Sequence, residues 1–255
     1  MDGVIPLSPT LDHVGPLART AADLEILFRV TSPTYEEQKS LPAKPVIGWV
    51  EPWFDRISPE VDRAVRSALD ELERAGFTVR EVELTPGLEE VLPASDVISR
   101  SEAFEIHQAG LAQTPHLYGL RVRERLLSGL ELRAVDLVRA LRIRNLITQA
   151  FKDLFHRIDF LVAPTLPIPA PPLGTERVHW PEGDEPLVPA MVRLLAAQNM
   201  AGVPALSLPC GFTPDLLPIG LQVVAGGHRE KALLELGKLY QSRTSWHERV
   251  PPDPV

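Results

Sequence analysis

Two side chains close together in sequence could act as nucleophiles. Cys210 lies between Pro209 and Gly211 at the end of an apolar run, and Ser207 lies inside the same run. A thiol or hydroxyl attacks a carbonyl only when a base or a lowered pKa activates it, and neither residue has a basic neighbour in sequence. We therefore favour structural roles: a packed thiol for Cys210 and a backbone-bonded hydroxyl for Ser207. Catalysis by either residue is the weaker alternative.

Several charged and amide side chains are weaker candidates for catalysis or substrate binding. Glu102 and Glu105 could form an acid–base pair, but their three-residue spacing on a polar helix face favours a solvated surface. Arg142 and Arg144 fall on different faces of an expected helix, where a solvated or ion-paired guanidinium is the usual role and carboxylate binding the alternative. Asn199 stands at a helix end, where capping is the default.

No pattern in the sequence indicates a metal or an organic cofactor. The motifs G-x-S-x-G, G-x-x-x-x-G-K-[ST], H-E-x-x-H and G-x-G-x-x-G do not occur in the expected contexts. The histidines are dispersed and none pairs at metal-ligand spacing, which favours structural or solvent-facing roles. They are His13, His107, His116, His156, His179, His228 and His247. We expect neither a metal site nor a cofactor.

Composition narrows the class of protein further. The chain has 255 residues, 44% of them hydrophobic, and a formal net charge of -8. This is enough apolar material for a core, while the acidic balance and the lack of a basic stripe argue against nucleic-acid binding. A single cysteine, no membrane-length apolar run and the N-terminus MDGVIPLSPT without a basic n-region predict a cytoplasmic protein.

A strand–helix–strand pattern in the first third predicts an α/β fold. The apolar run Val46–Val50 reads as a strand, Ser58 and Pro59 as the cap and first residue of an amphipathic helix, and Phe77–Leu84 as a second strand. Such a unit makes the two strands parallel. An earlier helix is expected over Ala21–Val30.

The middle of the chain is predicted to be nearly all helical. Helical character runs over Ser95–Ile158 with breaks at Thr114-Pro115 and Gly129, so that Leu130–Ile158 is expected to be the longest helix. Eight prolines then fall within Pro164–Pro189, which predicts an extended surface loop anchored by Trp180.

Two further apolar runs predict adjacent strands covered on both faces. They span Ala205–Leu208 and Ile219–Val224. Helices are expected on either side, over Ala190–Met200 and Arg229–Arg243, and a frayed tail over residues 247–255.

Blocks of sequence along nearly the whole chain resemble the amidase signature family. They are PLSPTLDHVGPLARTAADLEILF at 6–28, SRSEAFEIH at 99–107, DFLVAPTLPIPAPPLG at 159–174, NMAGVPALSLPCGF at 199–212 and LPIGLQVVA at 217–225. The resemblance implies a mixed, mostly parallel sheet flanked by helices, with residues 1–255 forming one partial amidase domain. It also implies a small amide substrate, cleaved by a serine–serine–lysine triad.

The family's catalytic motifs do not occur in these residues. No run like GGSSGGS is present, and no serine has glycine on both sides, so no catalytic residue carries over. The resemblance therefore implies the C-terminal portion of an amidase, which supplies sheet and pocket wall and is inactive alone. Its partner would be the missing N-terminal part or a companion chain.

By block position Arg144 in RIRNLI resembles the arginine that grips the substrate carboxylate in the glutamine-using branch. Asn199 is the second residue that we expect to bind substrate. That branch has an acidic residue where this chain has Val192, which favours a less polar amide over glutamine.

Two other interpretations stay open. The chain could be a non-catalytic binding or scaffold protein or a partner of another chain, including one resembling the A-type component of an amidotransferase, or an independent hydrolase using Cys210 or Ser207. Strand edges left unpaired would promote a homodimer or aggregation.

Overall fold

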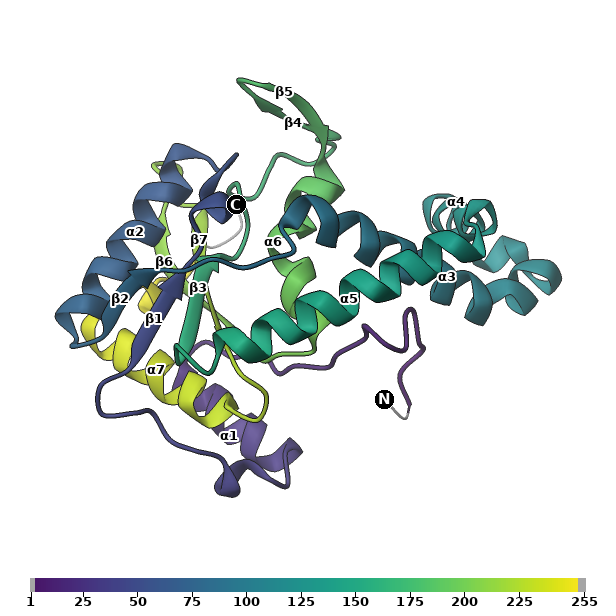
Figure 1. The fold of residues 1–255 in the computed structure, drawn as a ribbon. Helices are drawn as coiled ribbons and strands as arrows, with labels where there is room; N and C mark the ends of the chain where they lie inside the picture. Colours follow the sequence, from purple (N-terminus) through teal and green to yellow (C-terminus); the bar gives the residue numbers. More distant parts are fainter. Residues whose placement is uncertain (1–2, 252–255) are drawn as a thin grey trace.

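Five strands form one mixed sheet that helices flank (Figure 1). The computed structural model describes residues 3–251. The strand order is β2 (Thr78–Glu81), β1 (Val46–Trp49), β3 (Phe160–Pro164), β7 (Pro218–Ala225) and β6 (Ala205–Phe212). β1 is parallel to both β2 and β3, whereas β7 is antiparallel to β3 and to β6. Four strands thus point the same way, which confirms the expected mixed, mostly parallel α/β sheet flanked by helices.

The predicted strand–helix–strand unit is confirmed. β1 leads through a 3-10 turn (Glu51–Phe54) into α2 (Pro59–Arg74) and then to β2. Ser58 caps α2 because its hydroxyl accepts from the Val61 backbone N–H at 3.3 Å, and proline occupies the first helical position. The amphipathic pattern expected for α2 is confirmed, since its buried residues are Val61, Val65, Ala68, Leu69 and Leu72.

Helices cover the two faces of the sheet unequally. α2 and α7 (Glu230–Arg243) pack on β6 and β7, and α1 (Ala21–Thr31) packs on α7. α6 (Leu187–Ala201) reaches the other face, where Gln222 of β7 donates to the Leu194 carbonyl at 3.1 Å. The prediction of a strand covered on both sides is confirmed for β7 but wrong for β6.

β6 is an edge strand with one face open. Ala205 and Ser207 are exposed and alternate with buried Leu206 and Leu208. The run looks continuously apolar because the two outward-facing side chains are small, and small residues carry little information about burial. The open face of β6 defines one side of the cavity described below.

A helical lobe extends away from the sheet (Figure 1). It consists of α3 (Leu88–Gln113), a 3-10 turn (Pro115–Leu117), α4 (Leu120–Leu127), a second 3-10 turn (Ser128–Glu131) and α5 (Ala134–Leu154). The predicted breaks at Thr114-Pro115 and Gly129 are confirmed. The expected longest helix, Leu130–Ile158, is wrong: α3 is longer than α5, because Pro93 lies inside α3 without ending it.

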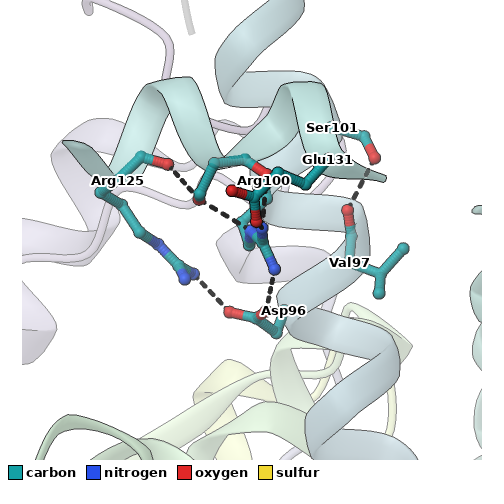
Figure 2. A network of polar contacts seen from close by, with 7 residues as sticks. Asp96, Val97, Arg100, Ser101, Arg125 and Glu131 are labelled. Atoms are coloured by element: carbon teal, nitrogen blue, oxygen red, sulfur yellow. Dashed lines mark hydrogen bonds and ion pairs between the residues drawn. The ribbon is translucent and has the colours of Figure 1, made fainter. Parts of the chain in front are cut away.

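An ion-pair network fastens α4 and the following turn to α3 (Figure 2). Arg100, whose side chain is 18% exposed, lies 3.5 Å from the Asp96 carboxylate and donates to the Ser128 hydroxyl at 2.8 Å. Arg125 of α4 binds the other Asp96 oxygen at 2.5 Å. Asp96 therefore holds two cations from different elements, and the turn at Gly129 is pressed against α3.

Glycine is required at position 129 by this close approach. A Cβ there would lie 2.5 Å from the Arg100 carbonyl oxygen and 2.5 Å from Phe104 Cβ, neither of which can rotate away. We expect Gly129→Ala to lower the free energy of unfolding by about 2 kcal/mol, measured by urea denaturation. Gly15→Ala is the matched control, since a Cβ at position 15 meets nothing within 4 Å. Equal stability of the two variants would contradict the packing described for this turn.

The proline-rich segment contains a hairpin. Within residues 164–189, β4 (Arg177–Trp180) and β5 (Gly183–Pro186) pair antiparallel, which corrects the expectation of an extended loop throughout. Five of the prolines precede the hairpin, Pro181 lies in its turn, Pro186 ends β5 and Pro189 lies in α6, so the inner paired positions keep their N–H donors. Trp180 donates to Glu185 at 2.7 Å and lies under the Arg193 guanidinium.

Near the C-terminus, the helix expected over Arg229–Arg243 is α7, which buries Leu233, Leu236 and Tyr240. The expected frayed tail is a 3-10 turn at Trp246–Glu248, and its last residues, 252–255, lie outside the described part. Over residues 3–251, no helix combines the length and apolar character that crossing a bilayer would need.

Candidate functional site

A cavity of about 610 Å³ opens beside the start of β6. Its walls come from the N-terminal segment, α1, the end of α6, the first residues of β6 and the start of α7. The lining residues are His13, Val14, Gly15, Pro16, Leu17, Ala18, Leu24, Phe28, Leu195, Gln198, Asn199, Gly202, Val203, Pro204, Ala205, Leu206, Ser207, Gln222, Gly227, His228, Glu230, Leu233 and Leu234. This volume and mostly apolar lining suit a small organic molecule.

The N-terminal segment is held in place by a carboxylate from α3. Glu102 accepts from the Ser8 hydroxyl at 2.6 Å, from the Thr10 hydroxyl at 2.6 Å and from the Thr10 N–H at 3.1 Å. Ser8 is only 2% exposed. The prediction of a solvated Glu102 is therefore wrong, whereas Glu105 is exposed as expected, and the two carboxylates do not act as a pair.

Arg144 of α5 completes this attachment from the other side. Its guanidinium donates to the Thr10 hydroxyl at 2.6 Å, to the Thr10 carbonyl at 2.7 Å and to the Met200 carbonyl at 3.1 Å. We call Ser8, Thr10, Glu102 and Arg144 the Thr10 lock. Because the Thr10 hydroxyl both donates to Glu102 and accepts from Arg144, it joins the two charges. Arg142 is exposed on another face of α5.

Asn199 stands on the cavity wall and contacts the same N-terminal segment. Its side-chain oxygen lies 3.0 Å from His13 Nδ1, which also lies 2.8 Å from the Leu11 carbonyl. The backbone carbonyl of Asn199 accepts from the Gly202 N–H at 3.2 Å, and Gly202 has φ +66° and ends α6. Asn199 is thus both at a helix end and on the cavity, whereas Arg144 is not among the lining residues.

The two candidate nucleophiles differ in exposure. Cys210 is 2% exposed, and burial raises the pKa of its thiol to about 12, so the predicted role of a packed apolar residue is confirmed. Ser207 faces the cavity, and its hydroxyl lies 2.7 Å from the Thr165 hydroxyl, so the expected bond to backbone is wrong. Among the described residues, its hydrogen bonds include none to a basic group.

Two buried glutamines lie among the polar residues of the cavity and were missed from the sequence. Gln198 and Gln222 are each 3% exposed. Gln222 donates to the Leu194 carbonyl, whereas neither polar atom of the Gln198 amide has a hydrogen-bond partner in the described structure. The available signal was a glutamine within the small, apolar end of α6, Ala196-Ala197-Gln198.

The wall formed by α1 depends on an ion pair with α7. Glu25 accepts from Lys238 Nζ at 2.6 Å and from the Tyr35 hydroxyl. Burial pushes the pKa of Glu25 upward, but the hydrogen bonds from Lys238 and Tyr35 outweigh it and leave the pKa below its ordinary value. The pair fixes the helix that carries Leu24 and Phe28 into the cavity.

This ion pair predicts a pH dependence. Because the pKa of Glu25 is lower in the folded chain than in the unfolded one, its stabilisation is complete above the unfolded pKa and is lost as the pH falls through the folded pKa. We expect Glu25→Gln to cost about 1 kcal/mol at pH 7 and progressively less toward pH 3. Urea denaturation at several pH values measures this, with Glu36→Gln, an exposed pair with Arg29, as control. A difference that does not vary with pH would contradict the assignment.

No group of three or more histidine, cysteine, aspartate or glutamate side chains within residues 3–251 could hold a metal ion.

The sequence of this chain matches a known protein family. The family model described as Amidase matches residues 1–234. The chain belongs to the amidase family.

The relatives of this amidase-family chain are longer than the chain itself. It is 38% identical to a Pseudomonas putida protein named amidase over 98% of the chain, and 32% identical over 99% to the A-type component of the glutamyl-tRNA(Gln) amidotransferase from Roseiflexus sp. (strain RS-1). It covers 57% and 58% of those relatives. A crystal structure of an amidase superposes with a TM-score of 0.83 at 33% identity, covering 94% of this chain and 55% of that one.

Proposed function

We propose that this amidase-family chain forms the sheet and part of the pocket wall of a site that hydrolyses the C–N bond of a small, weakly polar amide. The observation that supports the proposal is the cavity against the open face of β6, walled by an N-terminal segment that the Thr10 lock holds in place. The cavity has apolar walls and a few convergent polar groups, as sites for small molecules do.

We further propose that the nucleophile and its base come from residues outside this chain. Amide hydrolysis requires an activated hydroxyl or thiol that attacks the carbonyl carbon, N–H donors for the resulting oxyanion, and a proton for the departing amine. Cys210 is buried with a raised pKa, and the Ser207 hydroxyl is bonded to Thr165. A companion polypeptide that packs on the open face of β6 would place those groups at the cavity.

Asn199 and Arg144 have different proposed roles in this site. Asn199 lines the cavity, and we propose that its side-chain amide contacts substrate when His13 moves aside. Arg144 donates to Thr10 and Met200, so we propose that it supports the wall. The carboxylate-binding role that the resemblance implies for Arg144 stays a prediction.

An amidotransferase role is the second candidate, supported by the relatives that are A-type components of glutamyl-tRNA(Gln) amidotransferases. The apolar Val192, 41% exposed on α6, stands where the resemblance places an acidic partner for the α-amino group of glutamine. This favours hydrolysis of a less polar amide.

The open edge of β6 also predicts that the chain self-associates when no companion covers it.

Labelling with a fluorophosphonate probe tests whether this chain carries the nucleophile. We expect no labelling of residues 1–255 in the isolated protein, because the hydroxyl of Ser207, the serine on the cavity wall, is bonded to the Thr165 hydroxyl and not to a base. Ser207→Ala is the control variant. Stoichiometric labelling of the wild type that disappears in Ser207→Ala would overturn the proposal and favour an independent hydrolase.

A further inference from the structure

His13 places an imidazole ring with one unengaged nitrogen on the wall of the cavity. Its Nδ1 lies 2.8 Å from the Leu11 carbonyl and 3.0 Å from the side-chain oxygen of Asn199. Within residues 3–251, both hydrogen bonds of the ring go through Nδ1 and none goes through Nε2. The side chain is exposed and lines the cavity, so the ring is accessible to a molecule bound there.

The Leu11 carbonyl determines which ring nitrogen carries the proton. A carbonyl oxygen only accepts hydrogen bonds, so the bond to Leu11 requires a proton on Nδ1. In the neutral ring the basic lone pair then lies on Nε2. Asn199 offers a second oxygen to the same N–H. These two oxygens also stabilise a positive charge on the ring, as the acceptor opposite a catalytic imidazole does.

The ring is held by parts of the fold that are themselves fixed. Leu11 is 6% exposed and belongs to the main core, and the Thr10 lock holds the residue before it. Asn199 belongs to the last turn of α6. Because the ring is oriented in advance, less entropy is lost when Nε2 is brought against a bound molecule.

The rest of the cavity suits a neutral acyl compound with a flat apolar group. Leu24 and Phe28 of α1 and Leu206 of β6 contribute apolar side chains to walls around a volume of about 610 Å³. Glu230 lines the same cavity, and its carboxylate disfavours anionic ligands. An aryl ester is neutral, has such a group and carries a carbonyl carbon that an imidazole nitrogen can attack.

We infer that His13 gives this chain a second activity, the hydrolysis of activated aryl esters, with its imidazole as the nucleophile. Nε2 attacks the ester carbonyl carbon, and the bond between that carbon and the aryl oxygen breaks, so that the aryl oxide leaves with the electron pair. Water then attacks the acylated ring and gives one proton to solvent. The carboxylic acid departs, and the ring recovers its lone pair. The inference goes beyond the proposed function and does not depend on it.

The same step does not cleave an amide. An aryl oxide leaves readily, whereas an amine leaves only after its nitrogen has been protonated, and the attacking imidazole would be expelled first. His13 therefore provides no route to amide hydrolysis in the isolated chain. Ester cleavage without amide cleavage is the pattern that we expect from this residue.

Release of para-nitrophenol from para-nitrophenyl acetate by the isolated chain tests this inference. We expect the rate to saturate with ester concentration, because the cavity binds the aryl group. We expect kcat/KM to fall about tenfold or more in His13→Gln. His116→Gln is the matched control, since His116 is an exposed histidine of the helical lobe that does not line this cavity, and its kcat/KM should stay within about twofold of the wild type.

Acylation by diethyl pyrocarbonate tests the ring nitrogen in the wild-type chain, without any substitution. Measured by mass spectrometry of the separate peptides, His13 should be modified about fivefold or more faster than His116, because its Nε2 keeps the lone pair. The melting temperature of His13→Gln should stay within about 2 °C of the wild type, since the side chain is exposed. If that variant does not fold, the acylation rates decide the question.

Three results would overturn the inference. They are ester hydrolysis by the wild type that is absent or equal to that of His13→Gln, acylation of His13 no faster than that of His116, and loss of ester hydrolysis in Ser207→Ala but not in His13→Gln. The last result would assign the activity to the serine on the cavity wall.

Discussion

Phe151→Ala is expected to lower the free energy of unfolding by about 4 kcal/mol. Phe151 is 0% exposed, lies in the main core and stacks on Phe155 with ring centroids 5.8 Å apart. Truncation removes a large apolar side chain and leaves a cavity that the surrounding helices and sheet cannot close fully. Urea denaturation monitored by circular dichroism measures the loss.

The same substitution is expected to disturb the cavity at a distance. Phe151 and Arg144 are seven residues apart on α5, about two helical turns, and so share one face of the helix. Loosening the C-terminal end of α5 would shift Arg144 relative to Thr10. Leu146→Ala, at a side chain that is 57% exposed on the same helix, is the control and should cost less than about 1 kcal/mol. A comparable loss in both variants would show that α5 is not anchored through Phe151.

Arg144→Met is expected to cost about 3 kcal/mol and to release the N-terminal segment. The change removes three hydrogen bonds from a charged donor and leaves the Glu102 carboxylate with no cation opposite it across Thr10. Methionine keeps most of the apolar stem, so the loss reports the hydrogen bonds and the charge. Urea denaturation gives the stability.

Hydrogen exchange locates the effect of Arg144→Met. The backbone N–H groups of Leu11 and Asp12 both donate to the Ser8 carbonyl at 2.7 Å, within the segment that the Thr10 lock holds. We expect their exchange to accelerate at least tenfold in Arg144→Met and to stay at the wild-type rate in Arg142→Met, at an exposed arginine. Unchanged exchange in Arg144→Met would show that Glu102 alone holds the segment.

The parts of the fold that sequence predicts well are those fixed by local signals. One short stretch holds the cap at Ser58, the apolar stripe of α2 and the flanking apolar runs at Val46 and Phe77. Because these signals follow one another along the chain, they predict the strand, the helix and the second strand in the correct order. Errors arose where a local signal was overridden. Helical character was expected only from Ser95, whereas α3 begins at Leu88 and continues through Pro93, and the prolines between 164 and 189 left room for a hairpin between them.

Less of the candidate site could be predicted from the sequence, because its contacts join residues that are far apart along the chain. Glu102 meets Ser8 and Thr10 across 94 and 92 positions, and Arg144 meets Thr10 across 134. No spacing rule connects such pairs, so Glu102 looked like an ordinary surface carboxylate. Gln198 was missed for a related reason. Among the described residues its buried amide has no hydrogen-bond partner, and only the surrounding structure shows this.

Release of ammonia from benzamide tests the central claim most directly. The isolated chain is compared with the chain mixed with the part of the Pseudomonas putida amidase that it does not match, produced separately. We predict no ammonia above the uncatalysed background from either component alone and enzymatic turnover from the mixture. Turnover by the isolated chain at about 1 s⁻¹ or faster, with no companion present, would contradict the account.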